Sequence, residues 1–480
     1  MTAQEALKTY FGYDSFRLGQ DTVVSALLSG RDALAIMPTG AGKSLCYQIP
    51  ALLLPGLTLV ISPLISLMQD QVKGLSTAGI PAAYINSTLT ENQIAKALQL
   101  AAQGSYKIIY VAPERLESPT FQSFAAAAEI SMLTVDEAHC ISQWGQDFRP
   151  SYLRILDFID SLPRRPIVSA FTATATREVK DDIAQTLRLR DPEIVITGFD
   201  RPNLYYRVET IRRKDAFVAD YVRSHPGENG IIYCATRKNV DAVQEMLRGE
   251  DISAARYHAG MTNEERRQSQ NDFIYDTAPV IVATNAFGMG IDKSNVRYVI
   301  HYNMPQSMEN YYQEAGRAGR DGLPSQCILL FSPQDIVINR FLLDHKENDD
   351  LDDEAADLLR ARDNQRLQAM ANYCQTTGCL RNYILRYFGE EPAEPCGSCG
   401  NCDREFEEVD MTAQAKWMIN CVAETRGRYG KGVVLNTLRG ANMARLRELG
   451  AMDYRSYGQL KDCTRDELNC LLAQLLEEGY

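Results

Sequence analysis

Uninterrupted apolar runs alternate along most of the chain with segments of helical periodicity. The runs are ALAIM (33–37), TLVIS (58–62), KIIYVA (107–112), MLTVDE (132–137) and PIVSAFTA (166–173), then IIYCAT (231–236), VIVAT (280–284), RYVIHY (297–302) and CILLF (327–331). Runs of this kind, separated by helices, are typical of parallel strands that helices cover on both faces. The pattern therefore predicts an α/β fold with parallel sheets.

The series is divided at GFDRPNLYY (198–206), which we interpret as the boundary between two α/β domains. A third region begins with the acidic stretch DHKENDDLDDEAADLL (344–359), which is typical of a solvated helical face. A small helical domain punctuated by RGRYGKG and LRGAN follows. The predicted domains are 1–203, 204–338, 339–407 and 408–480.

The composition gives the chain ample core material and an acidic balance. Of the 480 residues 45% are hydrophobic, and the formal net charge is −12 at pH 7. A passive nucleic-acid binder is usually basic, whereas a motor needs only a local basic track. The acidic balance argues mildly against the first class and leaves the second in place.

Neither a signal peptide nor a membrane span is expected. The N-terminus carries Glu5 and Lys8 and lacks a long apolar stretch. The longest uncharged run, 44–69, is broken by three prolines into a helix end, a loop and a strand. Most of the 12 cysteines are scattered singly, as in a reduced cytosolic protein. We therefore expect a cytoplasmic protein.

The segment MPTGAGKS (37–44) follows an apolar strand and opens an apolar helix, the context that a phosphate-binding loop requires. Lys43 is predicted to reach the β- and γ-phosphates of ATP, and Ser44 to ligate Mg²⁺. Met37 stands where the general pattern has glycine, a departure usual in helicase-type motors. The remaining predicted phosphate contacts are Thr39, Gly40, Ala41 and Gly42.

Two further motifs supply the groups that hydrolysis needs. In MLTVDEAH (132–139) an apolar strand ends in Asp136, predicted to lie near the metal, and Glu137, predicted to activate the attacking water. In QEAGRAGRDG (313–322), Arg317 and Arg320 are candidates for the arginine finger that stabilises the transferred phosphoryl group. Taken alone, each motif also fits a structural role, as a glycine turn, a strand cap or a surface arginine pair. Their combination favours ATP hydrolysis.

With these motifs in place, the chain is similar to the RecQ family of superfamily 2 DNA helicases from about Leu7 to its end. SPLISLMQDQV, YVAPERL, FTATAT, IIYCATRK, YHAGM and VATNAFGMGID resemble the remaining helicase motifs, in order. FGYDSFRLGQ (11–20) resembles the segment that recognises adenine. By that resemblance Tyr13 stacks on the base, and Arg17 and Gln20 lie close to the nucleotide.

HCISQWGQDFRPSY (139–152) resembles the aromatic-rich loop that senses single-stranded DNA in this family. Trp144, Phe148 and Arg149 are the matching positions. The chemistry suits the role, because aromatic faces stack on bases without sequence preference while arginine holds phosphate. The alternative for Trp144 is a core position, which its Gln, Gly and Asp neighbours disfavour.

The third region contains the pattern C-x16-C-x2-C-x2-C, formed by Cys379, Cys396, Cys399 and Cys402. Four thiolates at this spacing suit a closed tetrahedral structural zinc site. Cys374 is a fifth candidate, which the family resemblance leaves outside the site. A disulfide pair is the alternative, and a cytosolic setting disfavours it.

The last segment resembles the family's winged-helix domain, which grips duplex DNA. LNTLRGANMARLREL (435–449) is expected to supply the contacting helix, with Arg439, Arg445 and Arg447 as DNA contacts. An amphipathic helix with solvated arginines is the alternative. Because the chain stops at LLEEGY, where the family continues into the wing, we expect a partial winged helix.

These observations predict two tandem RecA-like domains, a helical zinc module and a partial winged-helix domain. The function implied by the resemblance is an ATP-dependent DNA helicase that moves 3′→5′ on single-stranded DNA and unwinds duplex DNA, in recombination and repair. Expected cofactors are ATP, Mg²⁺ and Zn²⁺, and expected partners are DNA, single-stranded-DNA-binding protein and repair factors. The alternatives are an RNA helicase or remodelling ATPase with the same motor, and a non-catalytic scaffold. Intact Lys43, Glu137 and Arg320 argue against the scaffold.

Overall fold

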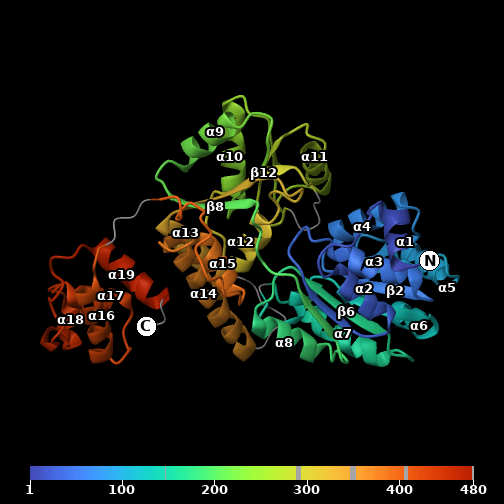
Figure 1. The fold of residues 1–480 in the computed structure, drawn as a ribbon, viewed down its shortest axis with the longest axis horizontal. Coiled ribbons are helices and arrows are strands. Elements are labelled where there is room, and N and C mark those ends of the chain that lie inside the picture. The colour runs from blue at the N-terminus through green and yellow to red at the C-terminus, as the bar shows by residue number, and fades with distance from the viewer. Residues whose placement is uncertain (146, 288–292, 346–352, 405–408, 478–480) are drawn as a thin grey trace.

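The computed structural model describes residues 1–145, 147–287, 293–345, 353–404 and 409–477. Two parallel sheets form the centres of two successive α/β units, and helices follow them (Figure 1). The first unit, blue to teal in Figure 1, lies beside the second, green to olive. The C-terminal helices, in red, lie at the opposite end of the molecule from the first unit. The predicted parallel sheets are confirmed.

The first sheet has seven strands in the order β3-β4-β2-β5-β6-β1-β7, all paired in parallel. The strands are β1 (Ala33–Ile36), β2 (Leu57–Ile61), β3 (Ala82–Ile85), β4 (Ile108–Val111), β5 (Ile130–Val135), β6 (Ile167–Thr172) and β7 (Glu193–Ile196). Alternate side chains of β1 enter two separate clusters: Ala33 and Ala35 on one face, Leu34 and Ile36 on the other. Both faces are therefore buried, which explains the uninterrupted apolar run.

Helices cover both faces of this sheet. α2, α3 and α4 contribute side chains to one cluster, and α5, α6, α7 and α8 to the other. The bounds are α1 (Ala3–Ala6), the π-helical turn η1 (Leu7–Phe11), α2 (Gln20–Leu28), α3 (Lys43–Leu53), α4 (Ile65–Thr77), α5 (Glu91–Ala102), η2 (Pro113–Arg115), α6 (Pro119–Ala127), η3 (Ala138–Ile141), α7 (Pro150–Ser161) and α8 (Arg177–Thr186).

The second sheet has six parallel strands in the order β10-β11-β9-β12-β13-β8. They are β8 (Leu204–Thr210), β9 (Asn229–Tyr233), β10 (Ala254–Tyr257), β11 (Val280–Ala283), β12 (Val296–His301) and β13 (Ser325–Phe331). The accompanying helices are α9 (Lys214–Ser224), α10 (Arg237–Gly249), α11 (Asn263–Ile274), α12 (Met308–Ala315) and α13 (Pro333–Asp344). α9 and α10 pack on one face of the sheet.

The cysteine-rich region packs on the other face of the second sheet. Its helices are α14 (Asp353–Gln375) and α15 (Leu380–Tyr387). Phe388 stacks on Phe199 with 4.5 Å between ring centroids, and Tyr373 lies 5.1 Å from Tyr311 of α12. This region therefore shares the core of the second unit. Within the predicted acidic stretch 344–359, Asp344 ends α13, residues 346–352 lie outside the described residues, and from 353 onward the stretch belongs to α14.

The C-terminal domain is helical, as predicted, but its expected DNA-contacting helix is divided. Its elements are α16 (Thr412–Glu424), α17 (Lys431–Leu438), α18 (Ala444–Glu448), η4 (Ala451–Asp453) and α19 (Arg465–Glu477). The chain leaves α17 at Arg439 and turns at Gly440, which has φ +69°. A continuous helix through 435–449 is thus wrong, because the left-handed glycine ends α17 and α18 starts anew. None of the helices in the described part of the chain combines the length and apolar character that crossing a membrane requires.

Candidate active site

The phosphate loop joins the end of β1 to α3. Gly42 precedes the helix with φ +80°, and a Cβ there would lie 2.5 Å from Nε2 of Gln20. The left-handed backbone conformation therefore favours glycine, and the amide of Gln20 would have to shift to admit a side chain. Lys43 begins α3, and its Nζ donates to the carbonyl of Met37 at 3.2 Å. The loop folds around its lysine at the N-terminus of a helix, an arrangement that favours anion binding.

The segment before α2 contacts this loop directly. Arg17 Nη1 donates to the carbonyl of Gly40 at 2.7 Å, and Gln20 Nε2 donates to the carbonyl of Ala41 at 2.9 Å. Tyr13 is exposed and lines the same cavity as Arg17 and Gln20. Arg17 and Gln20 thus contact the phosphate loop, and Tyr13 lines the cavity that they share.

Two carboxylates follow the end of β5. Asp136 is buried, and the hydroxyl of Tyr152 donates to its backbone carbonyl at 3.1 Å. Burial raises the pKa of Asp136 to about 7, with the charge of Glu137 acting in the same direction and Lys43 opposing it. Burial also lowers the pKa of Lys43, against the attraction of both carboxylates. The two carboxylates and the lysine thus form a buried cluster of charged groups, which is typical of functional sites.

Glu137 has φ +48°, a left-handed conformation that costs free energy for a residue other than glycine. Its Oε2 lies 3.4 Å from Nδ1 of His139, and it accepts no hydrogen bond from the described residues. His139 Nδ1 lies 2.9 Å from Oγ1 of Thr172, and burial lowers the pKa of the imidazole. A neutral histidine and a strained backbone thus hold a carboxylate oxygen that is available to accept a proton.

The second unit brings its arginines to the phosphate loop. Arg317 and Arg320 follow α12, and a Cβ built on Gly40 would lie 3.3 Å from Cγ of Arg320. Gln313 of α12 donates from Nε2 to Oγ1 of Thr174 in the first unit at 3.5 Å. The predicted arginine fingers therefore lie against the predicted phosphate site across the boundary between the units.

A cavity of about 580 Å³ lies between the two units, within the range of small-molecule sites. Its lining contains every predicted nucleotide, metal-binding or catalytic residue of the ATP site except Ala41. These are Tyr13, Arg17, Gln20, Thr39, Gly40, Gly42, Lys43, Ser44, Asp136, Glu137, Arg317 and Arg320.

The aromatic-rich loop is attached to α14. The guanidinium carbon of Arg362 lies 3.5 Å from the centroid of the Trp144 ring, and Arg362 Nη1 donates to the carbonyl of Gln143 at 3.1 Å. Arg366 Nη2 donates to the carbonyl of Trp144. Trp144 is nevertheless 46% exposed, so it is not a core residue. Part of the indole is accessible while a cation covers one face.

Phe148 and Arg149 point to different surroundings. Phe148 lines a small cavity with Gln143 and three residues of α14. Arg149 is half-buried and pairs with Asp147 at 2.8 Å, while its Nη1 donates to the carbonyl of Pro63 at 3.2 Å. It also lines the large cavity between the units. The loop therefore extends from the α14 contact to the edge of the predicted ATP site.

The four predicted cysteines come together. The sulfur atoms of Cys379, Cys396, Cys399 and Cys402 all lie within 4.8 Å of one another, and those of Cys396 and Cys402 are 3.9 Å apart. Tetrahedral zinc with Zn–S bonds of ~2.3 Å implies S···S distances of about 3.8 Å, so the group fits the metal. Cys374 is buried elsewhere and is not in this group.

The three arginines predicted to contact duplex DNA are all exposed, but they lie on different elements and have different partners. Arg439 follows α17, whereas Arg445 and Arg447 lie on α18. Arg447 Nη2 donates to Oδ1 of Asn442 at 2.8 Å, and Arg445 lies 3.9 Å from the carboxylate of Glu448. The structure places all three on the exposed surface of one small domain.

Several residues of the site are not predicted from the sequence. His139 contacts Glu137, Thr172 contacts His139, and Gln313 reaches Thr174 of the other unit, yet each lies within a motif that is interpreted as a whole. Arg362 and Arg366 contact the aromatic-rich loop from more than two hundred positions away. Their spacing of four on α14 places them on one helical face, but nothing in the sequence indicates what that face meets.

Family models match almost the whole chain. The matches are DEAD/DEAH box helicase at residues 17–182, helicase conserved C-terminal domain at 213–322, RecQ zinc-binding at 333–403 and RQC domain at 405–480. The chain therefore has the two helicase domains, the zinc-binding domain and the RQC domain that the predicted fold class comprises.

Solved structures support the fold of the motor. The helicase MrfA bound to DNA has a TM-score of 0.59 and 18% identity, covering 80% of this chain and 54% of that one. Dbp5 of S. cerevisiae bound to RNA also has a TM-score of 0.59, with 17% identity, covering 76% of this chain and 97% of that one. At these identities the likeness concerns the fold alone.

Relatives of known name are far closer in sequence. The ATP-dependent DNA helicase RecQ of Bacillus subtilis is 45% identical over all of this chain and 80% of its own length. The protein of the same name from Pasteurella multocida is 40% identical over all of this chain and 74% of its own length. A putative ATP-dependent RNA helicase of Acanthamoeba polyphaga mimivirus is 38% identical over 91% of this chain and 80% of its own length. The chain belongs to the RecQ family, and it is an ATP-dependent DNA helicase with a zinc-binding domain.

Proposed function

We propose that this helicase moves 3′→5′ along single-stranded DNA and unwinds the duplex ahead of it, with ATP bound in the cavity between the two sheet units. The main support is that a single cavity is lined by Lys43, Asp136 and Glu137 of the first unit and by Arg317 and Arg320 of the second. A nucleotide bound there contacts both units, so hydrolysis alters the contacts between them. The direction rests on the family resemblance.

Each predicted residue has a role in this proposal. Lys43 binds the β- and γ-phosphates, and Ser44 and Asp136 hold Mg²⁺. Glu137 accepts the proton of the attacking water, and Arg317 and Arg320 bind the γ-phosphoryl oxygens. Thr39, Gly40, Ala41 and Gly42 form the phosphate loop, while Tyr13, Arg17 and Gln20 bind the base side of the nucleotide.

The DNA contacts are proposed on chemical grounds. Trp144 and Phe148 offer aromatic faces to unstacked bases, and Arg149 a phosphate contact. Arg439, Arg445 and Arg447 are exposed on the C-terminal domain and would contact duplex phosphates. The same proposal places the domain limits at 203, 338 and 407 and the protein in the cytoplasm, associated with the nucleoid. It also includes a role in recombination and repair, and binding to single-stranded-DNA-binding protein and repair factors.

The direction is tested with tailed duplexes. A duplex with a 3′ single-stranded tail is expected to be unwound in the presence of ATP, whereas the same duplex with a 5′ tail or blunt ends stays paired. The measurement is the separation of fluorescently labelled strands over time. Unwinding of the 5′-tailed duplex at an equal rate would contradict the proposed direction.

An RNA substrate is the second candidate, favoured by the mimivirus relative named as a putative RNA helicase. It is distinguished by measuring ATP turnover with single-stranded DNA or RNA of the same length and base sequence. We expect stronger stimulation by DNA. Equal or stronger stimulation by RNA would favour the alternative.

Zinc is proposed to be structural, held by Cys379, Cys396, Cys399 and Cys402. Metal analysis should find about one zinc per chain, because four thiolates close the tetrahedron. Cys399→Ser is expected to lose zinc and to give unstable or insoluble protein, because Cys399 is fully buried. Cys470→Ser is the matched control, since Cys470 is exposed on α19 and should leave metal content and solubility unchanged. A stable wild-type chain free of metal would refute a structural zinc site.

A further inference from the structure

Arg201 lies in the connection between β7 and β8, and its side chain joins two loops of the predicted ATP site. Its Nη1 donates to the carbonyls of Thr39 and Gly316, each at 3.2 Å. Its Nη2 donates to the carbonyls of Ala318 at 3.0 Å and Gly319 at 3.1 Å. One guanidinium therefore holds the phosphate loop of the first unit against the arginine-bearing loop of the second.

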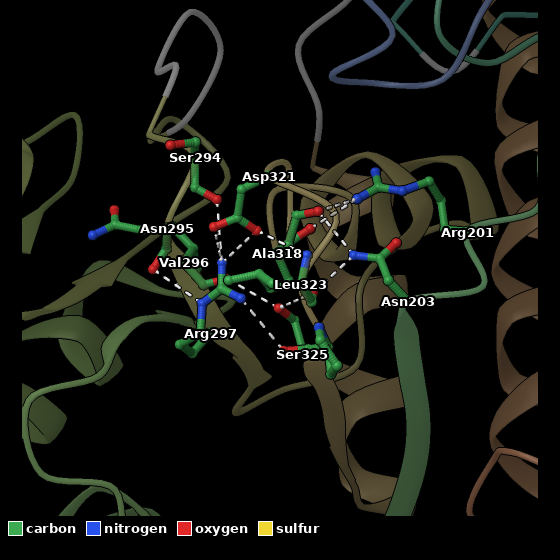
Figure 2. A network of polar contacts seen from close by, with 12 residues as sticks. Arg201, Asn203, Ser294, Asn295, Val296, Arg297, Ala318, Asp321, Leu323 and Ser325 are labelled. Carbon is green, nitrogen blue, oxygen red and sulfur yellow. Dashed lines mark hydrogen bonds and ion pairs between the residues drawn. The ribbon is translucent and has the colours of Figure 1, made fainter.

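A second side chain of the same connection fixes the arginine-bearing loop. Asn203 Nδ2 donates to the carbonyls of Gly319 at 2.8 Å and Leu323 at 3.0 Å (Figure 2). Gly319 has φ +56°, and a Cβ on it would lie 2.4 Å from Nδ2 of Asn203. The glycine thus permits the close approach of the connection.

On the other side of this loop, Arg297 Nη2 contacts both carboxylate oxygens of Asp321, at 2.7 and 2.6 Å (Figure 2). The two ends of the loop are therefore held by different arginines. Arg297 fixes Asp321, which directly follows Arg320. Arg201 donates to the carbonyls of Gly316 and Ala318, on either side of Arg317. Of these contacts, only those of Arg201 also reach the phosphate loop.

The chemistry of Arg201 suits this position better than that of lysine. A guanidinium presents its donors as a rigid planar fork, whereas an ammonium is a single centre on a flexible stem. The four acceptors are backbone carbonyls on two separate loops. A lysine ammonium at this place would reach one loop or the other without fixing the distance between them.

The connection is itself clamped by the cysteine-rich region. Arg381 of α15 donates from Nη1 to Asp200 Oδ1 and to the carbonyl of Arg201, both at 2.7 Å. Its Nη2 donates to the carbonyl of Leu204 at 2.7 Å. Arg381 is buried and stands two positions after Cys379. The backbone that carries Arg201 is thus fixed by the helix that begins at the cysteine cluster.

We propose that Arg201 is a positioning residue for ATP hydrolysis, which sets the loop of Arg317 and Arg320 against the phosphate loop, and that Arg381 ties this setting to the zinc-binding domain. The inference rests on the proposed role of those two arginines at the γ-phosphate. Displacing a catalytic group by about 1 Å can lower a rate by ~10²-fold. Among the described residues, the hydrogen bonds of the Arg201 guanidinium all go to backbone carbonyls, so it acts through the geometry of the two loops.

The test compares Arg201→Ala and Arg201→Lys with the wild-type chain. Both variants are expected to lower kcat for DNA-stimulated ATP hydrolysis by ~10- to 100-fold with KM for ATP nearly unchanged. ADP should bind as in the wild type, because it contacts mainly the first unit. The transition-state analogue ADP·AlF4⁻ should bind more weakly, because it also needs the second unit's arginines.

The ratio of the two dissociation constants separates positioning from folding. Both constants are measured by titration of the same sample, so a smaller folded fraction leaves their ratio unchanged. Arg223→Ala is the matched control, since Arg223 of α9 forms exposed ion pairs with Asp220 and Glu250. A wild-type ratio and kcat in Arg201→Ala would overturn the inference.

Arg320→Ala in parallel distinguishes failure of the inference from failure of the proposed site. A full loss of turnover in Arg320→Ala beside normal turnover in Arg201→Ala rejects only the positioning role. Normal turnover in Arg320→Ala rejects the arginine's proposed role, and the inference with it. Arg381→Lys is expected to lower kcat in the same direction with about one zinc per chain retained. An unchanged kcat there would remove the zinc-binding domain from the proposal.

Discussion

Glu137→Gln is expected to bind ATP normally and to lose its hydrolysis. The amide keeps the shape of the carboxylate but cannot accept the proton of the attacking water. General-base catalysis contributes ~10²–10⁴-fold to rates, so DNA-stimulated kcat should fall by about that factor. The measurement is ATP turnover at saturating single-stranded DNA, together with the dissociation constant of a fluorescent ATP analogue.

Two further variants are compared with Glu137→Gln. Lys43→Ala should lose both binding and turnover, because Lys43 is the residue expected to contact the phosphates. Glu117→Gln changes a carboxylate in an exposed ion pair with Arg154, and it should behave as the wild type. Rapid hydrolysis by Glu137→Gln would remove Glu137 as the base, whatever the other two variants do.

The interior of both sheets was predictable from the sequence, and the edges were not. The apolar runs correspond to β1, β2, β4, β5, β6, β9, β11, β12 and β13. The strands without such a run are β3, β7, β8 and β10, which are the edge strands of the two sheets. In β7, for example, Ile194 and Ile196 are exposed while the alternate positions are partly buried. A strand with one pairing partner and one solvated face keeps no continuous apolar run.

The candidate site was predictable where its chemistry is local. Lys43 and Ser44 stand at the start of a helix, and Asp136 and Glu137 at the end of a strand, so the motif and its structural setting coincide. Contacts between distant segments have no such signature. Arg201 lies in a segment interpreted only as a domain boundary, and Arg362 lies three residues beyond the acidic stretch 344–359 that is interpreted as a solvated helical face.

The Trp144–Arg362 contact changes what DNA must do at the aromatic-rich loop. An exposed cation–π contact stabilises by ~0.5–1 kcal/mol, whereas stacking of one base on an aromatic side chain contributes ~1–3 kcal/mol. A base is therefore able to displace the guanidinium from the indole, or to take its accessible part. The contact of Arg366 with the backbone carbonyl of Trp144 remains as an anchor of the loop.

A path of few residues joins this loop to the predicted catalytic base. Trp144 N–H donates to Oγ of Ser142 at 3.1 Å, and Ser142 N–H donates to the carbonyl of His139 at 3.2 Å. His139 in turn lies 3.4 Å from Glu137. A base that moves Trp144 thus acts on two successive hydrogen bonds and then on the close contact between His139 and the carboxylate of Glu137.

Trp144→Ala is therefore expected to keep basal ATP hydrolysis and much of its DNA affinity, yet to lose DNA stimulation and unwinding. Affinity survives in large part because phosphate contacts elsewhere carry most of it. Trp144→Phe retains an aromatic face and should recover most of the stimulation, which a purely steric role of the indole would not predict. The measurement is ATPase rate against the concentration of single-stranded DNA for the three proteins. A Trp144→Ala curve that overlays the wild type would show that Trp144 only anchors the loop to α14.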